Sequence, residues 1–319
     1  MSTFTLHDAG GVPARIALAA VGLAGLRVRQ SAAELGLGCL GAATPDESAE
    51  ALVERAQAAG CVALHPGEAS TRRQLDLARA CRAAGLAFVG PRVALIEAMQ
   101  DGAAARALLR EAGVPLAEEG LPGRRVELAV LCDRLARVRW LSVRESPRPG
   151  LVRAPVAWLT PEQRAYLGQL AVQGLAGLQL VGLVTLRFAV RDNRLGFCDM
   201  RPGLTGREAL DEALVGLDPA VVQLHLAAGD RLRERQAALM PRGHALQWHC
   251  VPAATAGISG GPGLRLDRAP ESGGEARLTA WGRNHEEAWR RGQRGLEELL
   301  GADSAVTLRD DLGGGPDAD

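Results

Sequence analysis

Residues 61–91 read CVALHPGEASTRRQLDLARACRAAGLAFVGP, and this segment contains the clearest signals of secondary structure in the chain. Residues 61–64 form a short apolar run that predicts a buried strand ending at a His-Pro-Gly turn. Residues 71–84 have the spacing of an amphipathic helix, and Gly85 supplies the left-handed residue that ends such helices. Residues 86–89 predict a second strand. A strand–helix–strand unit places parallel strands in one sheet, so the sequence predicts an α/β fold here.

The alternation of helix and strand extends to both sides of that stretch. Toward the N-terminus, residues 14–25 and 45–59 predict helices, the second with Asp46 or Ser48 near its start. Toward the C-terminus, residues 93–99 and 103–112 predict two more helices. The first part of the chain is therefore expected to be a parallel-sheet domain.

The second half of the chain predicts strands in pairs, and hence an α+β arrangement. The predicted strands are residues 126–133, 137–143, 182–190, 195–200, 244–251 and 276–281, and the predicted helices are residues 161–178, capped by Thr160, 210–227 and 286–300. Residues 182–200 predict a hairpin that turns at Asp192-Asn193.

The composition narrows the possible partners and compartment. Formal net charge is zero and no basic stripe dominates, so nucleic-acid binding has little electrostatic support and we expect no nucleic-acid partner. The six cysteines are scattered without a C-x-x-C pair, which predicts reduced thiols in the cytoplasm rather than a metal site. The apolar residues 16–26 are too few to cross a bilayer, so no membrane association is expected. Residues 313–319 (GGGPDAD) predict a disordered tail.

Four segments carry a resemblance to a known family. LHPGEAS (64–70), ARACRAAGLAFVGP (78–91), IEAM (96–99) and AARALLREAGVP (104–115) follow in that order. Together they resemble the N-terminal domain of biotin carboxylase, an ATP-grasp ligase of acyl-CoA carboxylases. Later segments, such as VGLVTLRFAV (181–190) and GHALQWHC (243–250), resemble its ATP-grasp core and C-terminal domain. The resemblance implies an N-terminal domain at 1–118, a core at 124–240 and a C-terminal region at 241–312.

The chain departs from the family pattern where the family holds ATP. All 37 of its Lys and Arg residues are arginine, whereas the family uses lysines, and the two are not interchangeable where geometry is fixed. About ten residues stand between Pro115 and Arg125, where the family carries its lid domain, so the resemblance implies that the lid is deleted. Gly102 stands where the family has a phosphate lysine.

The resemblance also identifies a vestigial cleft at Arg187, Asp199, Arg201 and His249. Asp199 matches the second of two Mg²⁺ carboxylates in the family, whereas Arg187 stands in place of the first, and an arginine repels the metal. Their spacing leads to the hypothesis of an ion pair between them. Arg201 and Arg207 have no fixed role, His249 aligns with an arginine thought to hold biotin, and the bicarbonate-lysine segment is shortened to residues 146–153.

Three functions follow from this pattern and stay open. The first is a catalytically degenerate protein, with no metal and no cofactor, that serves as a structural or regulatory subunit of a biotin-dependent acyl-CoA carboxylase such as acetyl-CoA carboxylase of fatty acid metabolism. Its expected partners are a second copy, an active biotin carboxylase or other acyl-CoA carboxylase subunits. The second is a divergent ATP-dependent ligase. The third is a sensor of an anion or acyl-CoA in the vestigial cleft.

Overall fold

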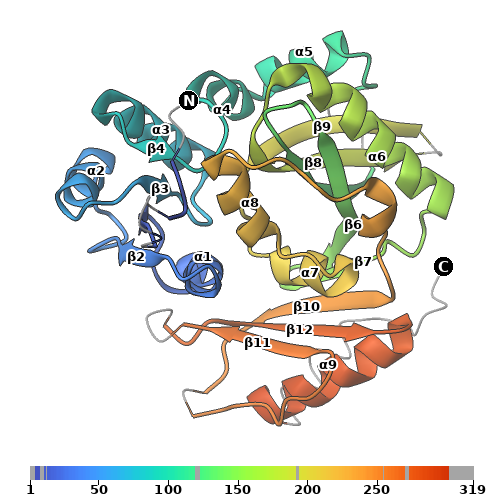
Figure 1. Cartoon of the computed structure of the whole chain (residues 1–319). Helices are drawn as coiled ribbons and strands as arrows, with labels where there is room; N and C mark the ends of the chain where they lie inside the picture. Colours follow the sequence, from blue (N-terminus) through green and yellow to red (C-terminus); the bar gives the residue numbers. More distant parts are fainter. Residues whose placement is uncertain are drawn as a thin grey trace.

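The computed structural model describes residues 4–7, 11, 13–118, 123–191, 194–253, 255–269 and 273–301. Within these residues the chain forms two sheets, one of four strands and one of eight (Figure 1). The predicted turn at Asp192-Asn193 and the predicted tail at residues 313–319 lie outside the described residues. No helix in the described part of the chain combines the length and apolar character that spanning a bilayer requires.

The smaller sheet is parallel, with the strand order β2-β1-β3-β4. Its elements are β1 (Arg15–Leu18), α1 (Gly22–Glu34), β2 (Gly38–Gly41), α2 (Ala49–Ala58), β3 (Ala63–His65), α3 (Thr71–Ala84), β4 (Ala87–Phe88), α4 (Val93–Gln100) and α5 (Gly102–Glu111). The predicted parallel α/β arrangement is confirmed. Helix α3 ends as predicted, since Gly85 adopts φ 71°.

The predicted helix at residues 14–25 is wrong, because the segment begins as β1 and turns into α1 only at Gly22. Ile16 and Leu18 are fully buried in a strand flanked by β2 and β3. A central strand of a parallel sheet is covered on both faces, so it is apolar at every position and has no period-two alternation. Such a run cannot be told from a buried helix by periodicity.

The larger sheet has the strand order β11-β12-β10-β7-β6-β5-β8-β9, with antiparallel neighbours. Its strands are β5 (Arg124–Cys132), β6 (Val138–Arg148), β7 (Leu151–Ala154), β8 (Gly182–Arg191), β9 (Arg194–Pro202), β10 (His244–Cys250), β11 (Leu264–Arg268) and β12 (Ala276–Gly282). The accompanying helices are α6 (Pro161–Leu175) with η1 (Ala176–Leu178), α7 (Glu208–Val215), α8 (Pro219–Ala228), η2 (Gln236–Leu239) and α9 (His285–Leu300).

The predicted single helix at residues 210–227 is two helices. Gly216 ends α7 with φ 69°, Asp218 caps the next helix through the N–H of Ala220, and Pro219 begins α8. Glycine after a helix and proline at the first position of the next are the usual end and start signals. The apolar periodicity on both sides masked this break.

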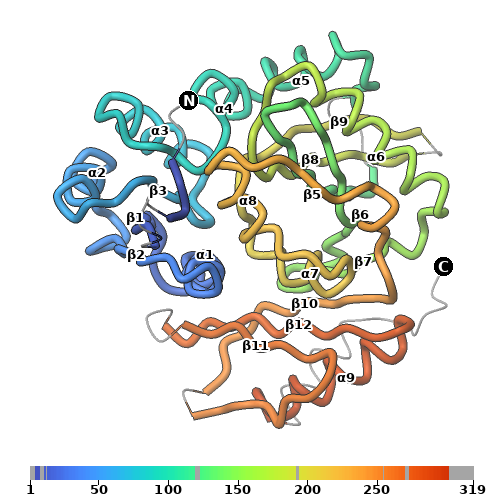
Figure 2. Tube along the Cα trace, in the orientation of Figure 1, coloured from blue at the N-terminus to red at the C-terminus, as the bar shows by residue number. Residues whose placement is uncertain are grey.

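The two sheets share one buried core and touch a second time near the C-terminal strands. Ile16 of β1 packs in the same apolar cluster as Leu131 of β5 and Leu224 of α8. Figure 2 shows α1 beside the β11 end of the larger sheet, where Gln30 donates to Asp267 and accepts from Arg265. Helix α1 of the smaller-sheet half is therefore hydrogen-bonded to strand β11 of the larger sheet.

Candidate functional site

Arg187 and Asp199 lie directly opposite each other on β8 and β9. Nε of Arg187 donates to Oδ1 of Asp199 at 2.6 Å, and Nη2 donates to Oδ2 at 2.5 Å, which is the bidentate fork of a strong ion pair. Burial lowers the pKa of Arg187, but the hydrogen bonds and charge of Asp199 outweigh burial and raise that pKa. The predicted ion pair is present, and Asp199 already has a cationic partner.

A buried cluster that the sequence analysis missed is centred on Arg144 of β6. Arg144 donates through Nη1 to Asp211 of α7, which also accepts from the hydroxyl of Ser142. Nη2 donates to the hydroxyls of Thr185 at 3.3 Å and Thr205 at 3.1 Å. Burial raises the pKa of Asp211 although Arg144 opposes it. No motif marks this pair, because its members lie 67 positions apart on different elements.

Glu127 of β5 connects this cluster with the β9–α7 turn. Its Oε2 accepts from Nε of Arg144 at 3.4 Å and from Nη1 of Arg207. Burial raises the pKa of Glu127, but the guanidinium groups of Arg144 and Arg207 outweigh burial and hold it below its ordinary value. Arg207, to which the sequence analysis gave no fixed place, is thus held by Glu127.

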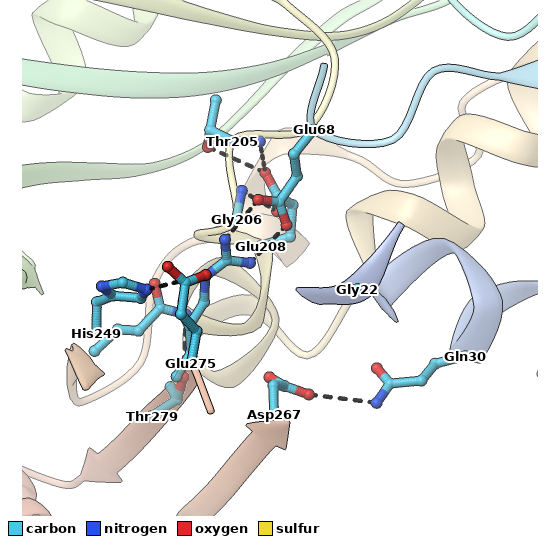
Figure 3. Close-up of polar contacts among 12 residues, drawn as sticks. Gly22, Gln30, Glu68, Thr205, Gly206, Glu208, His249, Asp267, Glu275 and Thr279 are labelled. Carbon is cyan, nitrogen blue, oxygen red and sulfur yellow. Dashed lines mark hydrogen bonds and ion pairs between the residues drawn. The ribbon is translucent and has the colours of Figure 1, made fainter. Parts of the chain in front are cut away.

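Glu68, in the turn after β3, forms a second fork with Arg277 of β12. Nη1 and Nη2 of Arg277 donate to its two oxygens at 2.5 Å and 2.6 Å. Burial raises the pKa of Glu68 to about 7, opposed by Arg277 and assisted by the charges of Glu208 and Asp267. Figure 3 shows the carboxylate groups of Glu68 and Glu208 close to each other, beside Gly206. Gly206 is required beside them, since a Cβ there would collide with the Arg277 guanidinium.

A cavity of about 570 Å³ opens beside Arg277. Residues 146–152, the turn 205–207, Gln247 and His249 complete its lining. Gln247 and His249 point away from Trp248, which packs against Gly292 of α9, so the cavity lies on the face of the sheet opposite α9. The basic residues of its lining, within the described part of the chain, are Arg148, Arg207, Arg277 and His249, and no carboxylate is among the lining residues.

The four residues of the predicted vestigial cleft lie in different surroundings. His249 lines the cavity, and its Nε2 lies 3.9 Å from Oε2 of Glu275 (Figure 3). Arg187 and Asp199 face each other across β8 and β9, and Arg201 is exposed farther along β9, opposite Thr185. The shortened segment 146–153 contributes residues 146–152 to the same cavity.

Within the described ranges no group of three or more His, Cys, Asp or Glu side chains is placed to hold a metal ion. The cysteines are free thiols, and burial raises the pKa of Cys132, Cys81 and Cys250. Neutral, buried thiols are poor nucleophiles and poor metal ligands.

Two consecutive parts of the chain match models of known protein families. Residues 28–96 match "Biotin carboxylase, N-terminal domain", and residues 95–235 match "Carbamoyl-phosphate synthase L chain, ATP binding domain". These two matches confirm the resemblance on which the sequence analysis relied.

Two relatives are similar over most of the chain. The 2-oxoglutarate carboxylase small subunit of Hydrogenobacter thermophilus is 24% identical, covering 82% of this chain and 76% of the relative. A pyruvate carboxylase subunit of Methanothermobacter thermautotrophicus is 22% identical, covering 78% of this chain and 70% of the relative. The first alignment runs over 360 residues, more than the 319 of this chain, so it contains positions that this chain lacks.

Solved structures share the fold. The biotin carboxylase domain dimer of the H. thermophilus 2-oxoglutarate carboxylase, in complex with MgADP, ADP and bicarbonate, matches with a TM-score of 0.81 at 21% identity, covering 89% of this chain and 90% of that chain. A complete multifunctional pyruvate carboxylase from Rhizobium etli matches with a TM-score of 0.81 at 22% identity over 90% of this chain. This chain spans 33% of that larger protein.

Proposed function

The chain carries the N-terminal and ATP-binding domains of the biotin carboxylase family, and from that premise we propose that it is a non-catalytic family member. It does not use Mg-ATP and acts by contact, as a structural or regulatory subunit of a biotin-dependent acyl-CoA carboxylase. The fold alone does not carry that function, so the support comes from the site.

One observation carries the proposal: the fork between Arg187 and Asp199. Mg²⁺ binds through hard anionic oxygens and needs carboxylates that are free to approach it. Both oxygens of Asp199 accept hydrogen bonds from a guanidinium, at the hairpin position where the family resemblance implies a metal. The cation needed to bridge the phosphates of ATP therefore has no ligand pair here.

Two further features support the loss of nucleotide chemistry. The neighbouring acids Glu127 and Asp211 are already engaged by Arg144 and Arg207, so neither supplies a replacement ligand. Helix α5 ends at Glu111 and β5 begins at Arg124, which leaves a short connection where the resemblance implies a lid. Without a lid the phosphates lose their backbone N–H groups and their shield from water.

The names of the relatives support the proposed partners. Two relatives are named as carboxylase subunits, and a solved structure of one of these carboxylases is described as a dimer of biotin carboxylase domains. The chain is therefore proposed to pair with itself, with an active biotin carboxylase or with other acyl-CoA carboxylase subunits.

The test has two arms on the purified chain. Calorimetry with Mg-ATP, and phosphate release with biotin and bicarbonate, are expected to give no signal, with an active biotin carboxylase as positive control. Biotin-dependent ATP turnover would establish the divergent ligase instead and end this proposal. In the second arm, mixing with active carboxylase subunits is expected to give a co-eluting complex, and separate elution of every mixture contradicts the subunit role.

The sensor function is a second candidate because of the cavity beside Arg277. Its lining contains three guanidinium groups that can donate to an anionic ligand, and two of them, Arg207 and Arg277, also pair with Glu127 and Glu68. This candidate is compatible with a non-catalytic subunit, since a ligand bound in the cavity would regulate the assembly rather than react.

A further inference from the structure

We propose that the cavity beside Arg277 binds a small organic anion through its carboxylate or phosphate group, with Arg277 and His249 as the primary contacts. The inference rests on the proposed function, because it assumes that the cavity serves binding without turnover. Glu68, which already accepts from Arg277, would compete with the ligand for that guanidinium.

The floor of the cavity places two basic side chains next to each other. His249 of β10 and Arg277 of β12 are direct cross-strand partners, so they project from the same face of the sheet. The next pair on that face, Gln247 and Thr279, is joined by a hydrogen bond of 3.2 Å. An anion between His249 and Arg277 can accept hydrogen bonds from both side chains.

Arg277 is held in place before any ligand arrives. Its Nη1 and Nη2 each donate once to Glu68, and its guanidinium passes the Cα of Gly206, where no side chain fits. A guanidinium has five N–H donors in a fixed plane, so the fork leaves three for another acceptor. Arg277 also lines the cavity, so its guanidinium is one of the groups that a ligand there would meet. A pre-ordered arginine binds a carboxylate or phosphate at a smaller entropic cost.

The remaining lining suits an organic anion rather than a bare inorganic ion. Arg148 at the end of β6 and Arg207 in the β9–α7 turn bring two more guanidinium groups to the lining, and that of Arg207 also donates to Glu127. Pro147, Pro149 and Val152 supply an apolar wall. A volume of about 570 Å³ lies within the range of small-molecule sites, which is roughly 300–1,000 Å³. The ligand class is therefore a small carbon skeleton with one or more acidic groups.

Glu68 and the ligand would share Arg277. Both need N–H groups of one guanidinium, and a ligand anion also repels the Glu68 carboxylate. Removing the Glu68 charge is therefore expected to tighten binding, whereas removing the His249 contact weakens it. Opposite effects at two positions distinguish a binding site from general damage to the fold.

The experiment measures calorimetric affinity for succinate, for glycerol phosphate, for inorganic phosphate and for bicarbonate, at constant ionic strength. Saturable binding of succinate or glycerol phosphate is expected, and these two arms distinguish the carboxylate from the phosphate source. His249→Gln is expected to weaken binding about 5- to 10-fold, the loss of one charge-assisted hydrogen bond. Glu68→Gln is expected to strengthen it about 3- to 10-fold. Arg290→Gln, at an exposed position of α9, is the matched control and should bind as the wild type does.

Several results would overturn the inference. They are the absence of saturable binding, binding of bicarbonate or inorganic phosphate alone, and an equal loss of affinity in His249→Gln and Arg290→Gln. Circular dichroism of each variant verifies that it folds. ATP turnover measured on the same preparations would refute the proposed function without bearing on anion affinity, so the two failures are separable.

Discussion

The fork between Arg187 and Asp199 is tested most directly by a double-mutant cycle of Arg187→Met and Asp199→Asn. Both side chains are about three-quarters buried, with 27% and 24% of their surfaces exposed. Two unit charges 4 Å apart attract by about 4 kcal/mol at an effective dielectric constant of roughly 20. Desolvation and side-chain ordering offset most of that energy. The expected coupling free energy is therefore about 1–2 kcal/mol.

The assay is urea unfolding of the wild type, both single variants and the double variant, each with and without MgCl₂. The matched control is the same cycle on Arg290 and Glu286, an exposed i,i+4 pair on α9. That pair should couple by only about 0.3–0.5 kcal/mol. A coupling below about 0.3 kcal/mol at Arg187 and Asp199 would refute the reasoning. So would Mg²⁺ that stabilises the wild type but not Asp199→Asn, since Asp199 would then be available to a metal.

Three further predictions concern stability. Gly168→Ala should lower the free energy of unfolding, measured in urea, by about 1–3 kcal/mol, because a Cβ there would overlap the Trp140 indole. Gly177→Ala is the control and should cost far less, since nothing lies within 4 Å of a Cβ at that position. Asp211→Ala should cost about 3–5 kcal/mol, since it leaves the buried Arg144 without its main counter-charge, and a loss under 1 kcal/mol would argue against that pair. The third prediction concerns Glu68, whose pKa is higher in the folded protein than in the unfolded chain. The free energy of unfolding should therefore fall by at most about 3 kcal/mol as the pH rises from about 4.5 through 7. Glu68→Gln should lack this pH dependence.

Local signals were sufficient for much of the fold. Helix α3 was predicted over its full length because its amphipathic period and Gly85 agree. Strand β11 was missed, since Leu264–Arg268 follows a Gly-rich loop and is half-buried along most of its length, without clear alternation. The error at β1 has a related cause, because a strand buried on both faces has no polar face to mark its period.

In the candidate site too, contacts between residues close in sequence were predictable, whereas contacts between distant residues were not. Arg187 and Asp199 belong to one hairpin, where spacing alone indicates that they face each other. Glu68 and Arg277 lie 209 positions apart, in the turn after β3 and in β12, so no spacing rule brings them together. The cavity could not be predicted from the sequence because Arg277, one of its lining residues, is held by such a distant contact. The predicted boundary between residues 240 and 241 stays a prediction.

The order of strands in the larger sheet has a consequence for any attempt to divide the chain. Strand β10 pairs with β7 through Ala245 and Ala154, in the interior of the sheet. A fragment that stops at Met240 would keep the pairing of β7 with β6 but would leave the N–H and C=O groups on the other edge of β7 without partners, and such bare edges recruit strands from other molecules. The last quarter of the polypeptide is therefore not a detachable module, and shortened fragments are expected to precipitate unless it is supplied in trans.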